Sequence, residues 1–305
     1  MATGYDVSGL GGTYTKDSAD KASYIYKMLA QGASASLFPK QPGIKSVQNI
    51  HIISNSPVWQ AQACSFTASA NTTLTVRAIT VGTPSIMMKW CEKDLEAKFT
   101  QLSMKAGSKL DTLTFETQIV GDIMQQTTRD IEVAIWKGDT SSTNQQLLHF
   151  DGLQKLIAAA SIGYTGNPAV WSVANSRSIM QNFITGLTDD MLAQASGKIF
   201  MGTAEARDYR LKLGIDNLYH NTGADAKLYA ENTDIEIVPT LGLSGTKALY
   251  FMPVDYTYIG TDLTGEEDNY ELFYAQEARE LRFITEWKMG INFAFPTLIA
   301  KVLNT

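Results

Sequence analysis

The sequence predicts an α+β fold, and three features of its pattern support this expectation. The segment 46–90 is rich in β-branched and aromatic residues and almost free of charge. One long helix is indicated over 110–137, where apolar residues recur at every fourth position. Strand-like runs dominate again from Asp234 onward. With 305 residues, the chain is long enough for one large domain or two ordinary ones.

Composition narrows the class of protein. With 44% hydrophobic and 18% charged residues, the chain has enough apolar material for a core and is not a disordered protein. It has no run of eighteen apolar residues, and residues 1–30 lack the pattern of a secretory signal, so we expect neither a membrane span nor export. The two cysteines, Cys64 and Cys91, are far apart and are interpreted as free thiols.

The charges are unevenly distributed along the chain. Residues 1–150 carry 13 Lys and Arg against 12 Asp and Glu, whereas residues 151–305 carry 12 against 19, within a net charge of −6. A protein that grips duplex DNA shows an excess of Lys and Arg on one face. The sequence therefore argues against tight nucleic-acid binding.

The first segments of the chain have little to bury. Residues 1–45 are rich in Gly, Ser, Thr and Ala, with a short amphipathic helix expected over about 20–31, and they are interpreted as an extended arm. Two strands, 58–67 and 72–81, joined by a turn at 68–71, are expected to form a ribbon.

A two-stranded ribbon is marginally stable in water, and an uncharged one aggregates unless it is covered. We therefore expect the ribbon to pack on another subunit. The alternative is that it forms half of an ordinary sheet within its own domain.

The helix over 110–137 ends at Gly138, the residue type favoured just beyond a helix, and would be roughly 40 Å long. It is either a member of a helical bundle or the spine of a flat α+β domain, and its strand-rich flanks favour the spine. A shorter helix is expected over 91–104.

The second half of the chain is expected to begin with a compact α+β subdomain. A short helix expected over 153–161 precedes this subdomain, which spans about 162–255. Its expected elements are a helix over 172–196, a buried strand at 198–202, a helix capped by Thr203, and strands at 235–239 and 248–253. Further strands are expected at 256–260, 270–274 and 280–295.

Several local strings follow one another in an order found in one family. They are LTVR at 74–77, CEKDLE at 91–96, IEVAIWKGD at 131–139, FDGL at 150–153, IVP at 237–239 with Gly242-Leu243, and the segment 282–290. In content and order they resemble the major capsid proteins of tailed bacteriophages, the Hong Kong 97 type, and those of gut-bacterial phages in particular. No single string is specific; their order and spacing carry the resemblance, which covers nearly the whole chain.

The resemblance implies a division of the chain into five parts. These are an N-terminal arm (1–45), an extended loop (46–90), a peripheral domain with the spine helix (91–161), an axial domain (162–255) and the return strands of the peripheral domain (256–305).

The resemblance also implies a structural protein that assembles as hexamers and pentamers into an icosahedral phage head around double-stranded DNA. Expected partners are further copies of the chain, a portal and decoration proteins. A separate scaffolding protein is expected because the arm begins directly at Met1. No lysine occurs in 46–88, so the isopeptide bond that some members form at this loop is not expected. The expected location is the virion, assembled in the cytoplasm of a bacterial host.

Four residues are candidates for the interface between subunits. Trp59, Phe66 and Met87 match the aromatic and Met enrichment of interface cores. Arg77 is the one charged residue between Ser46 and Met88 and is expected to meet a carboxylate of a neighbouring subunit. The alternative for Arg77 is an ordinary solvated arginine.

Other classes of protein remain open at this stage. An encapsulin-type nanocompartment shell has the same fold, and another β-rich virion protein, such as a tail tube, is an alternative that the long helix disfavours. An enzyme would need the acids at 189–190 or 266–268 to converge, whereas charge runs usually lie on solvated loops. His51, His149 and His220 have no ligand-like spacing, so we expect no catalytic residue, cofactor or metal.

Overall fold

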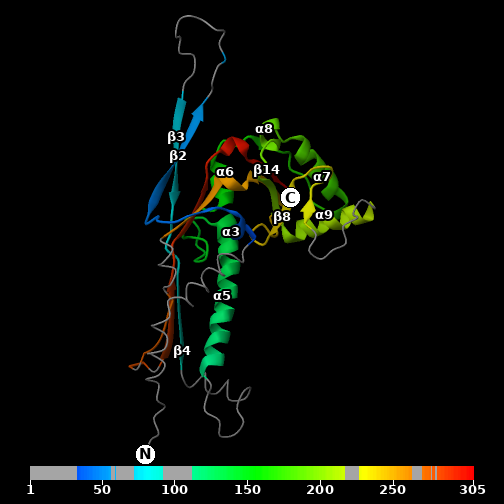
Figure 1. Ribbon diagram of the computed structural model, residues 1–305. Helices are drawn as coiled ribbons and strands as arrows, with labels where there is room; N and C mark the ends of the chain where they lie inside the picture. Colours follow the sequence, from blue (N-terminus) through cyan, green and yellow to red (C-terminus); the bar gives the residue numbers. More distant parts are fainter. Residues whose placement is uncertain are drawn as a thin grey trace, which may run out of the picture.

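The computed structural model describes residues 33–55, 59, 72–91, 112–216, 227–262, 270–275, 277–278 and 280–305. Its helices are α3 (Ala33–Leu37), α5 (Thr112–Lys137), α6 (Leu153–Ala159), α7 (Val173–Thr185), α8 (Asp189–Leu192) and α9 (Thr203–Ile215). Figure 1 shows α7, α8 and α9 gathered around one sheet, while α5 extends away from it toward the bottom of the view.

The largest sheet has six strands in the order β5-β14-β9-β6-β8-β7. These are β5 (Tyr164–Thr165), β14 (Ala300–Leu303), β9 (Ala248–Pro253), β6 (Gly197–Gly202), β8 (Glu236–Thr240) and β7 (Leu228–Tyr229). The central strand β6 runs parallel to β8 and antiparallel to β9. Strand β14 comes from the end of the chain and lies between β5 and β9, so the sheet is complete only when residues 300–303 are in place.

The two faces of this sheet bury two separate cores, because successive side chains of a strand point to opposite faces. On one face Phe251 packs with Tyr209 and other apolar residues of α7 and α9. On the other face Phe200 and Tyr250 lie against Trp136 near the end of α5, with ring centroids 5.3 and 5.6 Å from the indole. The spine helix α5 is thus fixed by its last turns to this six-stranded sheet, which we name the axial sheet after the expected axial domain.

Two smaller sheets flank the spine helix. Strands β11 (Tyr270–Ala275), β12 (Glu280–Glu286) and β4 (Ser85–Cys91) form one antiparallel sheet. Strands β1 (Lys40–Gln41), β10 (Thr257–Thr261) and β13 (Met289–Phe293) form the other. Segments from the beginning, middle and end of the chain therefore meet in these two sheets, as Figure 1 shows for β4 and its orange neighbours.

The ribbon consists of β2 (Val47–Asn55) and β3 (Thr72–Thr80), paired antiparallel along their full lengths. The described partner of 72–80 is thus β2, whereas the sequence pattern predicted 58–67. Most of 58–67 lies outside the described residues, and Trp59, which is described, is in no strand. Pairing with β2 is favoured because its register places Ile52 and Ile79 on one face, where both are buried against the body of the chain.

Most other expected elements are present with shifted ends. The expected α+β class and the long helix are confirmed, the helix as α5. The expected strand at 280–295 is divided into β12 and β13. The cap of α9 is Gly202 rather than Thr203, which is the first helical residue. Cys91 ends strand β4, while the remainder of 91–104 and the expected helix at 20–31 lie outside the described residues.

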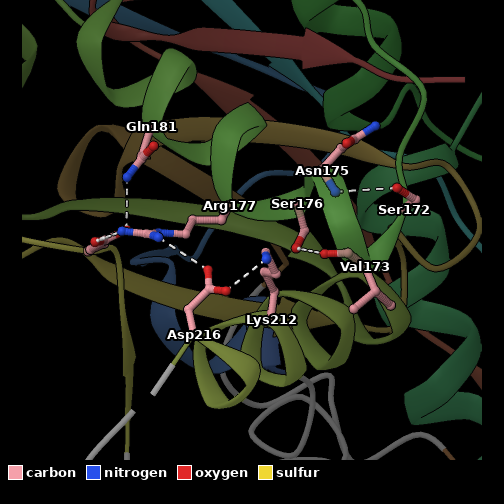
Figure 2. A network of polar contacts seen from close by, with 9 residues as sticks. Ser172, Val173, Asn175, Ser176, Arg177, Gln181, Lys212 and Asp216 are labelled. Carbon is pink, nitrogen blue, oxygen red and sulfur yellow. Dashed lines mark hydrogen bonds and ion pairs between the residues drawn. The ribbon is translucent and has the colours of Figure 1, made fainter. Parts of the chain in front are cut away.

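A network of charged side chains joins α7 to α9 (Figure 2). The Arg177 guanidinium donates to both Glu231 carboxylate oxygens, at 2.8 and 2.6 Å, and to Asp216 Oδ2 at 3.1 Å. Lys212 Nζ donates to the other Asp216 oxygen at 2.8 Å, and Gln181 donates to Glu231. Hydrogen bonds from Arg177 lower the pKa of Glu231, and those from Lys212 and then Arg177 lower the pKa of Asp216.

Replacement of Trp136 by Ala is expected to lower the free energy of unfolding by about 3–5 kcal/mol, because it leaves a cavity between α5 and the axial sheet. Chemical denaturation of the purified chain measures this loss. Leu211→Ala is the control, since Leu211 is 52% exposed and its truncation is expected to change stability by less than about 0.5 kcal/mol. Equal effects of the two substitutions would contradict the role assigned to Trp136.

The Arg177 network is expected to lose its stabilising effect in acid. Because the folded-state pKa values of Glu231 and Asp216 lie below their ordinary values of 4.5 and 3.8, stability from these groups is present above those values and is lost as the pH falls through the lowered ones. Arg177→Gln is therefore expected to lower the melting temperature at pH 7 and to have a smaller effect near pH 3. An equal decrease at both pH values would show that the carboxylates are not involved.

Candidate subunit interface

The ribbon has two chemically different faces, which follow from its register. Cross-strand partners and residues two positions apart share a face of an antiparallel pair. The inner face carries Ile52 and Ile79, which are 7% and 0% exposed. A Cβ atom on Gly260 of β10 would lie 2.7 Å from the Ile79 side chain, so the missing side chain at Gly260 leaves room for the base of the ribbon.

Arg77 lies on this inner face and packs within its own chain. Its guanidinium carbon is 4.3 Å from the ring centroid of the buried Phe293 in β13, a cation–π contact. Burial lowers the pKa of Arg77. Beside it, Asn292 Nδ2 donates to the Ala78 carbonyl at 2.6 Å. The carboxylate expected from a neighbouring subunit stays a prediction, while the aromatic contact is one that sequence reasoning did not anticipate.

The outer face of the ribbon mixes aliphatic side chains with exposed polar ones, Asn49, His51, Asn55, Thr72 and Thr80, and no described part of the chain covers it. Four aliphatic side chains share it and are more than half exposed: Val47 (55%), Ile53 (61%), Leu74 (70%) and Val76 (52%). Ile53 and Leu74 are direct cross-strand partners. We name these four residues the outer ribbon face. Isolated exposed aliphatic residues are ordinary, but several on one face of a strand pair indicate a surface that binds another protein.

The expected interface residues lie in different places. Trp59 follows β2 and is 96% exposed, so its indole is free for an intermolecular contact. Phe66 lies outside the described residues. Met87 is 67% exposed and belongs to β4, in a different sheet from the ribbon, opposite Ile284 of β12. Among the described candidates, Met87 therefore lies in a different part of the fold from Trp59 and Arg77.

The charges near Met87 are paired within the chain. Lys89 Nζ lies 3.1 Å from Glu280 Oε1, and Arg282 lies 3.4 Å from the other oxygen of Glu280. The hydrogen bond from Lys89 is the main cause that lowers the pKa of Glu280. This sheet therefore presents a mixed surface of methionine and ion pairs, in contrast to the aliphatic outer ribbon face.

Sequence reasoning did not single out Val47, Ile53, Leu74 and Val76 as exposed residues of one ribbon face. The alternation of Leu74 and Val76 with polar residues predicts a strand with one apolar and one polar face. It did not tell which face turns outward, because that depends on the pairing of β3 with β2 and on the contact of the ribbon base with β13.

The residues considered for an enzyme or a metal site do not converge where the structure describes them. Asp189 and Asp190 lie exposed in the first turn of α8, where negative charge is favourable, and the acids at 266–268 lie outside the described residues. Among the described residues, no three His, Cys, Asp or Glu side chains are grouped to hold a metal ion. No described helix is long and apolar enough to cross a membrane.

No family model and no curated protein matches the sequence, so the comparison rests on solved structures. A chain from the procapsid of satellite phage P4, which includes the size determination protein, aligns with a TM-score of 0.59 and 9% identity, over 97% of this chain and 94% of that chain. A capsid chain of a native GTA particle aligns with a TM-score of 0.57 and 11% identity, over 92% and 90%.

A third structure comes from the capsid of the myovirus phage XM1, with a TM-score of 0.54 and 12% identity, over 91% of this chain and 92% of that chain. In all three cases the likeness extends over nearly the full length of both chains. The chain has the Hong Kong 97-type fold of the major capsid proteins of tailed phages.

Proposed function

We propose that this chain is the major capsid subunit of a tailed phage, which assembles as hexamers and pentamers into an icosahedral head around double-stranded DNA. The observation that carries the proposal is the fold shared with phage capsid chains over nearly their whole length. The outer ribbon face supports it, because a shell subunit needs an adhesive surface that the isolated chain leaves uncovered.

The chemistry of the outer ribbon face suits contact with another copy of the chain. Aliphatic side chains gain stability from burial without needing a charged partner at a fixed place. Burying the exposed part of each of Val47, Ile53, Leu74 and Val76 would contribute on the order of 1 kcal/mol per side chain. Trp59 would extend this surface beyond the end of β2.

In this proposal the subunit is a structural protein and not an enzyme, and the virion is its location. The excess of acidic residues in 151–305 agrees with a wall that does not hold packaged DNA through many phosphate contacts. The further partners implied by the resemblance are a portal, a separate scaffolding protein and decoration proteins.

Leu74→Asp is expected to abolish shells while leaving the fold intact, because Leu74 is 70% exposed in the single chain and would be buried in the assembly. Thr73→Asp is the matched control, since Thr73 is also exposed but lies on the opposite face of the same strand. Electron microscopy and sedimentation measure assembly, and circular dichroism monitors the fold. Normal shells from the Leu74 variant would refute the role of the outer ribbon face.

Particles that contain this chain, recovered from the cells or lysate in which they form naturally, are expected to hold nuclease-protected double-stranded DNA. The physical reason is that a closed shell excludes nuclease from its contents. Nuclease treatment, followed by extraction and electrophoresis of nucleic acid and protein, measures the contents. Particles that enclose an enzyme cargo and no DNA would instead identify an encapsulin-type shell.

A further inference from the structure

A buried glutamate of the spine helix holds the segment 33–38, which we name the arm segment. Glu132 is 3% exposed and Ser34 is 0% exposed. The Ser34 hydroxyl donates to Glu132 Oε1 at 2.6 Å, and the Ser34 backbone amide donates to the two carboxylate oxygens at 3.1 and 3.2 Å. The backbone amide of Ala35 is a further donor to this carboxylate.

This arrangement is a helix cap supplied by another part of the chain. Ser34 and Ala35 are the second and third residues of α3, whose amides have no acceptor within the helix and are normally satisfied by a capping side chain. A helix of five residues is unstable alone. Glu132 therefore fixes α3, and the arm amides in turn satisfy a carboxylate that would be costly to bury without partners.

Trp136 joins the same group of contacts one helical turn later. Its indole Nε1 donates to the Ser34 hydroxyl oxygen at 2.8 Å. The Ser34 hydroxyl thus accepts from Trp136 and donates to Glu132, and chained hydrogen bonds of this kind strengthen one another in a buried site. Burial raises the pKa of Glu132, and the Ser34 hydrogen bonds oppose this shift.

The axial loop 241–246 rests on the same turn of the spine helix. A Cβ atom on Gly242 would lie 2.4 Å from Trp136 Cδ1 and 2.5 Å from the Glu132 carbonyl oxygen, so only glycine permits this approach. Lys137 Nζ donates to the Ser244 carbonyl at 3.1 Å. The stretch from Glu132 to Lys137 therefore contacts both segments. The Glu132 and Trp136 side chains contact the arm segment. The Glu132 carbonyl, the Trp136 indole and Lys137 contact the axial loop.

We propose that Glu132, Ser34 and Trp136 form a latch that couples docking of the arm segment to docking of the axial loop. Each segment fixes the position of the Trp136 indole against which the other packs. Release of one segment then weakens the other, so that the arm and the axial domain change position together. This inference concerns the single chain and stands independently of the proposed function.

Hydrogen exchange of the purified 305-residue chain tests the coupling, because two sets of amides report on the two segments. The Phe38 amide bonds to the Ser34 carbonyl and reports on α3, while the Ser244 and Thr246 amides bond within the axial loop. Glu132→Gln and Ser34→Ala are expected to accelerate exchange at Phe38 by about fivefold or more, the typical effect of losing a helix cap. Both are also expected to accelerate exchange at Ser244 and Thr246.

The reverse experiment uses Gly242→Ala, which pushes on Trp136 and Glu132 from the side of the loop. Since thermodynamic coupling is reciprocal, this substitution is expected to accelerate exchange at Phe38. Gly214→Ala is the matched control, because an added Cβ at Gly214 meets nothing within 4 Å. Asp130→Asn is the control for Glu132→Gln. In the described part of the chain, the Asp130 carboxylate accepts hydrogen bonds from the side-chain amides of Gln126 and Gln146 and not from the arm segment.

The proposal is overturned if Glu132→Gln leaves Phe38 protected, or if each substitution affects only the segment in which it is made. If Glu132→Gln prevents folding, Ser34→Ala and Gly242→Ala still decide between coupled and independent docking. Acceleration at both segments by both substitutions, with no change in the two controls, supports the latch.

Discussion

The packing of the last turns of α5 against the axial sheet is the contact on which the rest of the structure depends. Trp136 is fully buried and touches Phe200 and Tyr250 from two different strands. The same residue bonds to the arm at Ser34 and leaves room for the backbone of Gly242. Because one indole fills the space between these parts, the long helix, the axial sheet and the arm take fixed positions relative to one another.

The ribbon shows the opposite situation, in which apolar side chains stay exposed in the described part of the chain. A two-stranded ribbon has two faces, and the described body of the chain covers the inner one at Ile52 and Ile79. The outer ribbon face is left with four half-exposed aliphatic side chains. A firmly attached base with an adhesive outer face is the construction that a repeating assembly requires, because the ribbon holds its direction while its contact surface stays open.

Several charged side chains in the described part of the chain form ion pairs within the subunit. The Arg177 network ties α7 to α9, and Lys89 and Arg282 both pair with Glu280 on the sheet of β11, β12 and β4. Arg77, the single charge of the ribbon region, lies on an aromatic ring. Assembly contacts through the ribbon would therefore depend on shape and apolar area, and they are expected to be only weakly sensitive to salt.

The sequence by itself determined the elements whose signal is local. Fourfold apolar spacing and a terminal glycine located α5, and the apolar runs located β6 and β9, because helix and strand periodicity depends only on neighbouring residues. The near absence of charge in 46–88, where Arg77 is the one charged residue, led to the expectation of an intermolecular surface, which stays a prediction.

Only the tertiary structure decided the pairings between distant segments. It joined β3 to β2, placed Arg77 on Phe293, and brought Ser34 to Glu132 across 98 positions of the chain. Strand propensity does not determine which strands pair. Even on a known strand, it does not determine which of the two faces is buried. Burial against parts of the chain remote in sequence makes that choice, so the outer ribbon face was visible only once the fold was known.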